Sequence, residues 1–489
     1  MFLEQPKKRR VWPYVLIIVL LLAGVFGIWA YRFGKQFAFR HIVTSSLVQE
    51  KVKEYIGEKE SKLLEVLPEI AGISQPKTYL LLFANNTELR PGGGFLGVYA
   101  VVRVSQGDIR IIRVEGTEVL DRQTPSSWKP IPPQPLTDHL KVDRWYFRDS
   151  NWSPDFVESS KQALAFYAAE GGIAADDIDA VIAVTPTVLE HVLAIVGPVT
   201  VQGMTFTAEN VTEKLEYEVE YGYDDRGVPR LERKKIIEPF FQTLLDRVRG
   251  DLFVHGGEFW RLGEKMAEEK HIMVYAIPET WQTMFDDYGF SGRVKETNGD
   301  YLLWVDANLA ALKTDHAMLR TLRYALSEKN GEYIAEVSMR YKNNGSFDWR
   351  TTRYRTYARI FVPDGARLIG VEGAMKTDRS TQPGTVEQGK TLGKQWFGTF
   401  IAIEPGEQKT LTFRYALPKQ IGESITNGSY SLLVQKQLGT IAHGLTLDLN
   451  FGRTITTATP GEEEKRWGDT RYQIETDLRT DRTFRATFK

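Results

Sequence analysis

The chain has 489 residues, a formal net charge of −1 and no cysteine, and 42% of its residues are hydrophobic. The near-neutral charge lacks the basic signature of a nucleic-acid-binding protein, so no nucleic-acid partner is expected. The absence of cysteine excludes disulfides, thiolate catalysis and cysteine-ligated metals. A chain of this length and apolar content predicts about two or three domains.

An uncharged stretch, VWPYVLIIVLLLAGVFGIWAY, occupies residues 11–31. At about 1.5 Å per residue, a helix of this length crosses the hydrocarbon core of a bilayer. The basic residues KKRR precede it, which predicts a cytoplasmic tail at residues 1–10 and an extracytoplasmic location for the chain after Arg32. The sequence thus indicates a single-pass membrane protein. The alternatives are a cleaved signal peptide, for which the run is long, and a buried core helix.

Residues 32–72 carry apolar residues at roughly helical spacing and are expected to form a juxtamembrane stalk that docks on the next domain. In residues 73–308, short apolar strands alternate with amphipathic helices, which predicts an α/β sandwich with helices on the faces of a sheet. One helix is expected to begin with Ser153 as its N-cap and Pro154 as its first residue. The predicted strands are 77–83, 95–104, 109–114, 178–184 and 271–277, and a further helix is predicted at 186–195.

Residues 309–489 change to period-two patterning, as in the alternation of Tyr333, Ala335, Val337, Met339 and Tyr341 with polar neighbours. Many short strands separated by Gly and Pro turns predict an all-β sandwich of immunoglobulin type.

The most unusual loop of the α/β region reads ANNTELRPGGGFLG and joins two predicted strands. Glycines permit positive φ and bring backbone N–H groups close to an anion, and the guanidinium of an arginine suits phosphate. The loop is therefore a candidate anion site, and a structural connection between strands is an equal alternative. Its candidate ligand-binding residues are Asn85, Asn86, Glu88, Arg90, Gly92, Gly93 and Gly94.

A second candidate segment contains Arg148, Asp149 and Asp155. Asp155 lies in the first turn of the predicted helix, where the helix dipole alone favours a carboxylate. Common nucleotide-binding, esterase and metalloprotease motifs are missing from the sequence, and its seven histidines are scattered. The acidic run between Glu213 and Asp225 is more typical of a solvated helix face than of a cation site, so no metal site is predicted from the residues.

Three segments resemble the bacterial family called domain of unknown function 4012: LLLFANNTELRPGGGFLGVYAVVRVSQGDI, RDSNWSPDF and IDAVIAVTPTVLEHVLAIVGPVTV. The resemblance covers most of the chain after the apolar stretch, and the family name implies no activity. It does imply a bacterial plasma-membrane protein whose bulk lies outside the membrane.

The order of strands and loops also looks distantly like the LytR–CpsA–Psr fold, whose members transfer glycopolymers from a polyprenyl pyrophosphate carrier to the cell wall. In that family Arg and Asp residues, often with Mg²⁺, bind the pyrophosphate. Arg90 matches the first loop arginine of the pattern. The next motif, Pro-Arg-Asp, is replaced here by Val114-Glu115-Gly116-Thr117, so Arg148 and Asp149 are the substitutes that the resemblance leaves as catalytic candidates.

Two functional hypotheses follow from the resemblance. In the first, the protein binds, and in a stronger form transfers, a polysaccharide linked to a polyprenyl (pyro)phosphate, with a cell-wall polymer as acceptor and Mg²⁺ as a cofactor if transfer is retained. In the second, it is a non-catalytic envelope scaffold or surface-binding protein with a vestigial pocket, and its β-sandwich meets a partner. The first requires Arg90 and Arg148 to face one pocket, and the second requires Arg90 to be held in a structural ion pair.

Overall fold

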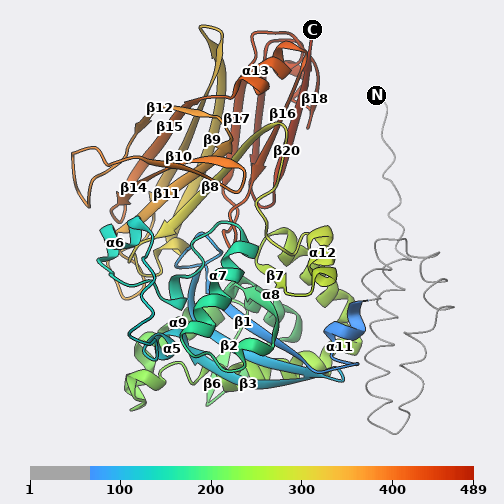
Figure 1. Cartoon of the computed structure of the whole chain (residues 1–489), viewed down its shortest axis with the longest axis vertical. Helices are drawn as coiled ribbons and strands as arrows, with labels where there is room; N and C mark the ends of the chain where they lie inside the picture. Colours follow the sequence, from blue (N-terminus) through green and yellow to red (C-terminus); the bar gives the residue numbers. More distant parts are fainter. Residues whose placement is uncertain (1–65) are drawn as a thin grey trace, which may run out of the picture.

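A computed structural model describes residues 66–489 as an α/β lobe and a strand-rich lobe stacked along the long axis (Figure 1). The predicted cytoplasmic tail, membrane helix and most of the stalk lie outside the described residues. Within residues 66–489, none of the helices combines the length and the apolar content needed to span a bilayer. The membrane anchor therefore stays a prediction.

The α/β lobe is built on a five-stranded mixed sheet in the order β3-β2-β1-β4-β7. The predicted hairpin is confirmed: β2 and β3 pair antiparallel through Gln106 and Gly107, which both have positive φ. β4 pairs parallel to β1, and β7 pairs antiparallel to β4. The strands are β1 (Lys77–Asn85), β2 (Phe95–Ser105), β3 (Asp108–Gly116), β4 (Ile178–Val184) and β7 (Ile272–Ala276).

Side chains alternate between the two faces of the sheet along each strand. Apolar side chains therefore point to both faces, and helices cover both. Leu80 and Leu82 of β1 pack with Phe166 of α7 in one cluster, and Tyr79 packs with Trp281 of α12 in another. The predicted α/β sandwich is thus present. Its helices are α5 (Thr117–Asp121), α6 (Gln134–Leu140), α7 (Phe156–Ala169), α8 (Pro186–Val196), α9 (Val211–Tyr217), α10 (Tyr223–Asp225), α11 (Ile237–Glu268) and α12 (Glu279–Tyr288), with a small hairpin of β5 (Val199–Val201) and β6 (Met204–Phe206).

The start of α7 differs from the expectation. Asp155, not Ser153, is the N-cap, because its carboxylate accepts the backbone N–H of Glu158 at 3.1 Å. Ser153 instead lies in the approach to the helix, where its hydroxyl accepts the N–H of Asp155. Pro154 therefore precedes the helix.

The strand-rich lobe is a sandwich of a seven-stranded and a six-stranded sheet. The predicted alternation in β10 is confirmed, because Tyr333, Ala335, Val337, Met339 and Tyr341 are all buried. The first sheet contains β13 (Glu387–Thr391), β14 (Lys394–Ile403), β11 (Tyr354–Pro363), β8 (Asp300–Asn308), β16 (Ser429–Gln435), β20 (Arg482–Phe488) and β18 (Ile455–Thr459). The second contains β12 (Arg367–Glu372), β15 (Gln408–Ala416), β10 (Glu332–Asn343), β9 (Met318–Lys329), β17 (Gly444–Asn450) and β19 (Arg471–Asp477), and helix α13 (Lys419–Thr426) follows β15.

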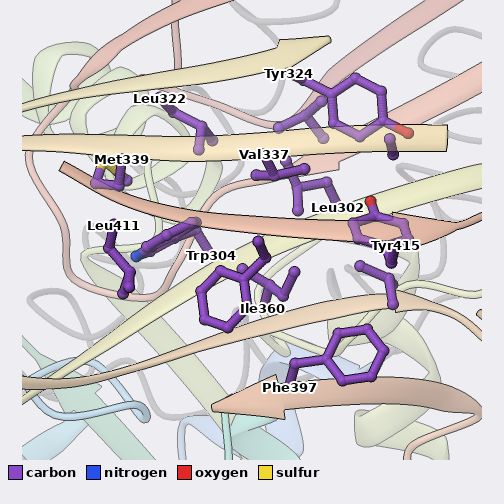
Figure 2. Packing of buried hydrophobic residues seen from close by; sticks show 14 of the residues in the cluster. Leu302, Trp304, Leu322, Tyr324, Val337, Met339, Ile360, Phe397, Leu411 and Tyr415 are labelled. Carbon is purple, nitrogen blue, oxygen red and sulfur yellow. The ribbon is translucent and has the colours of Figure 1, made fainter. Parts of the chain in front are cut away.

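Two features of the sandwich go beyond the expected pattern. β8, which we placed in the α/β region, is a central strand of the seven-stranded sheet. β8 pairs parallel with β16, and β9 pairs parallel with β17, whereas the sheets of an immunoglobulin sandwich are antiparallel. Figure 2 shows the core between the sheets, where Trp304 of β8 lies opposite Met339 of β10 and Leu411 of β15.

The end of the expected stalk is docked on the α/β lobe. Residues 66–70 are helical, and Val66 and Ile70 pack on the cluster around Trp281. The indole Nε1–H of Trp281 donates to the carboxylate of Glu69 at 2.9 Å, and the hydroxyl of Tyr79 donates to the carbonyl of Ile70 at 2.6 Å. Residues 66–70 therefore lie against α12 and the sheet face that it covers.

Candidate functional site

The loop Asn85–Gly94 forms the seam between the two lobes. The carbonyl of Leu89 accepts the N–H of Asn308 at 2.9 Å, and the N–H of Leu89 donates to the Asp315 carboxylate at 2.9 Å. Asn86 reaches further along the chain and donates to the carbonyl of Gly439 at 2.9 Å. Asn85 stays within the α/β lobe, where its amide donates to Glu216 at 3.2 Å. The polar residues of this loop thus satisfy each other and the facing lobe.

The three glycines of the loop lie where other backbone segments approach closely, including a loop that enters from the sandwich. Gly92 forms a parallel bridge with Leu438, and a Cβ at Gly439 would lie 1.9 Å from the Gly93 carbonyl oxygen. The N–H of Gly92 donates to the carbonyl of Asn151, and the N–H of Gly93 donates to that of Arg90. The carbonyl of Gly94 accepts the Asn151 amide at 2.8 Å. Close packing of backbones explains these glycines, and two of their N–H groups already have acceptors.

Arg90 is almost fully buried, with a 3% exposed fraction. Its Nε donates to the Asp149 carboxylate at 3.2 Å, and its Nη1 donates to the Asn308 carbonyl at 2.5 Å. Its Nη2 lies 3.6 Å from the carboxylate of Glu88, and the ring of Phe95 lies 5.1 Å from its guanidinium. This arrangement meets the requirement of the second hypothesis, a structural ion pair at Arg90.

Arg148 joins the same network through Asp149. Its Nε lies 3.6 Å from the second Asp149 oxygen, and its Nη1 donates to Asp121 at 2.6 Å. Asp121 also acts on the buried carboxyl of Glu170, because burial, followed by the charge of Asp121, raises the pKa of Glu170 to about 8. The protonated form of Glu170 is therefore favoured at neutral pH in the folded protein. The sequence-predicted arginines converge on one carboxylate, not on an open pocket.

Asp155 has a separate structural role. One of its oxygens caps α7, and the other accepts the N–H of Val294 at 2.9 Å. Burial raises the pKa of Asp155, and these backbone donors oppose that rise. Its carboxylate thus joins the start of α7 to the segment before β8.

An apolar cavity of about 160 Å³ lies beside the seam, between the sheet and helices α8, α9 and α11. Its volume resembles that of an engineered apolar cavity of about 150 Å³ that binds benzene. Two of its lining rings, Phe83 and Phe241, contact each other with centroids 4.4 Å apart. Its apolar lining consists of Phe83, Phe95, Val98, Val184, Pro186, Leu189, Leu215, Val219, Ile237 and Phe241.

Charged side chains border the cavity. Lys313 of the sandwich lobe donates to Glu220 at 3.2 Å, and Arg233 donates to the other Glu220 oxygen at 2.6 Å. Burial raises the pKa of Glu88, and the charges of Arg90 and Lys313 oppose that rise. For Lys313, burial disfavours the ammonium, but Glu88 and Glu220 outweigh it and raise its pKa. The border is thus a set of partly exposed ion pairs around an apolar space.

The residues around Arg90 do not fit a Mg²⁺ ion. Asp149 contacts an arginine with each oxygen, and Asp121 contacts Arg148. Within residues 66–489, no group of three His, Asp or Glu side chains is arranged to hold a metal ion. In the acidic run, Glu216 and Glu218 are paired with Arg350 and Arg226.

Sequence reasoning missed the cavity. Its lining comes from separate segments between residues 83 and 313, which only the folded chain brings together. The one local signal was the apolar content of Leu215, Val219, Ile237 and Phe241 within the region where strands and amphipathic helices were expected to alternate.

Residues 74–220 match the family model described as Protein of unknown function (DUF4012). The family resemblance read from the sequence is thus confirmed. No curated protein matches the chain.

Proposed function

We propose that this protein binds the lipid-linked form of a bacterial envelope polysaccharide and does not transfer it. The apolar cavity carries the proposal: it would hold a segment of the polyprenyl chain, with the phosphate at its charged border. The N-terminal apolar stretch would place the protein in the plasma membrane, with both lobes outside.

The size and chemistry of the cavity support a chain, not a whole glycan, as the bound group. A volume of about 160 Å³ accommodates a short run of isoprenoid carbons. Burying apolar carbon there is favourable by about 25 cal/mol per Å². The border offers Arg233, Lys234 and Lys313 to a phosphate, although each cation already has a carboxylate partner nearby.

The contacts of Arg90 support binding without transfer. A catalytic arginine must be free to stabilise charge that develops in the transition state. Here the guanidinium is committed to Asp149 and to the Asn308 carbonyl.

The experiment is to measure binding of farnesyl phosphate by titration calorimetry, with the full chain held in nanodiscs. Leu189→Trp adds bulk to the cavity and should weaken binding by roughly tenfold or more. The control variant Val254→Trp introduces a tryptophan at a site on α11 with a 78% exposed fraction. This variant should bind farnesyl phosphate normally. Absence of binding by the unchanged protein, or equal binding by Leu189→Trp, would refute the proposal.

The scaffold hypothesis is the second candidate, and the same Arg90 contacts favour it. In that case the two lobes form a rigid platform, the cavity is vestigial, and the strand-rich lobe meets an envelope partner. Failure of farnesyl phosphate to bind, with the seam intact, would favour this alternative.

A further inference from the structure

Three aromatic rings gather on the surface beside the border of the cavity. Tyr217 and Tyr221 lie one turn apart with ring centroids at 6.1 Å and planes 28° from parallel. Trp349 of the strand-rich lobe packs edge-on against both, at 5.4 Å and 5.9 Å. The rings therefore come from both lobes but form one cluster.

These rings are not core residues. Tyr217 and Tyr221 have exposed fractions of 40% and 48%. Phe347, two residues before Trp349 in the same loop, has an exposed fraction of 64%. Single exposed apolar side chains are ordinary, whereas a group of exposed rings marks a binding surface. The helix also changes to π geometry at Glu218–Gly222, a feature frequent at functional sites.

The loop that carries Trp349 is held in place. The Asp348 carboxylate accepts the N–H groups of Arg350 and Thr351 at 2.8 Å and 2.7 Å. Arg350 crosses to the α/β lobe and pairs with Glu216 at 2.8 Å. A surface that is ordered before binding loses less conformational entropy when a ligand docks.

The cluster is continuous with the cavity through one helical segment. Glu216, Val219 and Glu220 line the cavity, and Tyr217 and Tyr221 alternate with them along the chain. A chain in the cavity would thus bring the group attached to its phosphate next to the rings.

We propose that Tyr217, Tyr221 and Trp349 stack a neutral or amino-sugar ring of the glycan. A pyranose presents a face of C–H bonds to an aromatic ring, and its hydroxyls donate to carboxylates at the edge. Glu213 supplies such a carboxylate, with a 63% exposed side chain. The exposed charge of Glu213 disfavours a uronic acid beside it by like-charge repulsion. This inference rests on the proposed function, because it assigns the headgroup of the same ligand.

The test presents the full chain in nanodiscs to an array of lipid-free bacterial oligosaccharides with neutral, amino and uronic sugars. The unchanged protein should bind a neutral or amino-sugar oligosaccharide. The double variant Tyr217→Ala/Tyr221→Ala should weaken that binding by roughly tenfold, while Tyr217→Phe/Tyr221→Phe should retain most of it. Trp467→Ala, at an exposed ring of the strand-rich lobe outside the cluster, is the control and should have no effect.

Farnesyl phosphate titration of the same variants separates the two proposals. If farnesyl phosphate binds normally but no oligosaccharide binds, only the proposed glycan site is overturned. The same holds if the alanine variant binds the glycan as well as the unchanged protein does. Glycan binding that depends on the rings, without farnesyl phosphate binding, would overturn the proposed lipid site alone. If the protein binds no glycan but co-sediments with phosphatidylglycerol vesicles in a way that depends on the rings, the rings contact a membrane. That result would also overturn the proposed glycan site.

Discussion

The two lobes hold their charges in different ways. In the sandwich, Arg320 pairs with Asp306 and Asp315, and all three side chains are at most 8% exposed. At the cavity border of the α/β lobe, Arg233 and Glu220 are 18% and 33% exposed and surround an apolar space. A charge that is fully enclosed and fully paired serves the fold, whereas partly exposed charge beside a cavity remains accessible to a ligand. Arg90, at the seam, belongs with the first kind.

The largest effect is expected at Arg320. Arg320→Ala leaves Asp306 and Asp315 buried without their cation and should lower the free energy of unfolding by about 3–5 kcal/mol. Arg323→Ala, on the same strand, removes a 41% exposed partner of Asp448 and should cost at most about 1 kcal/mol. Denaturant unfolding of both variants provides the measurement. Equal losses in the free energy of unfolding would contradict the distinction between enclosed and exposed charge.

Arg90→Ala tests whether the seam arginine is structural. Its loss leaves Asp149 and the Asn308 carbonyl without their buried donor, and we expect a loss of about 3 kcal/mol. Farnesyl phosphate binding should persist at temperatures where the variant is folded. If the melting temperature is unchanged but farnesyl phosphate binding is lost, Arg90 contributes to an anion site, as the sequence suggested.

Local patterns predicted much of the fold, because they depend on neighbours in the chain. The β2–β3 hairpin follows from its turn residues, and the core face of β10 follows from alternation. The partners of the glycine loop could not be predicted, since the bond from Asn86 to Gly439 joins residues 353 positions apart. The sequence singled out Arg90 as a ligand-binding candidate, but the structure holds it between Asp149 and the backbone carbonyl of Asn308, and a backbone carbonyl has no signature in sequence.

The glycine seam allows a sharper comparison between close packing and backbone conformation. Gly439 and Gly203 have φ values of +72° and +77°, but a Cβ at Gly439 would meet the Gly93 carbonyl at 1.9 Å, while one at Gly203 meets no atom of the described residues within 4 Å. Gly203→Ala should therefore cost only the conformational strain, about 1 kcal/mol. Gly439→Ala should cost about 1–3 kcal/mol more, because the two loops must move apart. Equal thermal shifts would mean that the seam is not tightly packed in solution.

The last comparison concerns a buried acid, Glu170, that keeps its proton beside Asp121. Burial and the charge of Asp121 raise the pKa of Glu170 from 4.5 to about 8, so the folded state binds the proton more tightly than the unfolded state. The stabilisation is complete below pH 4.5 and is lost as the pH rises through 8. Glu170→Gln cannot ionise, and its amide can donate to Asp121 while its oxygen still accepts the N–H of Phe147. The variant should nearly match the unchanged protein at pH 5 and exceed its stability by up to about 4 kcal/mol at pH 8.5. Unfolding curves at these two pH values measure the difference, and parallel pH profiles would show that Glu170 does not keep its proton in the folded protein.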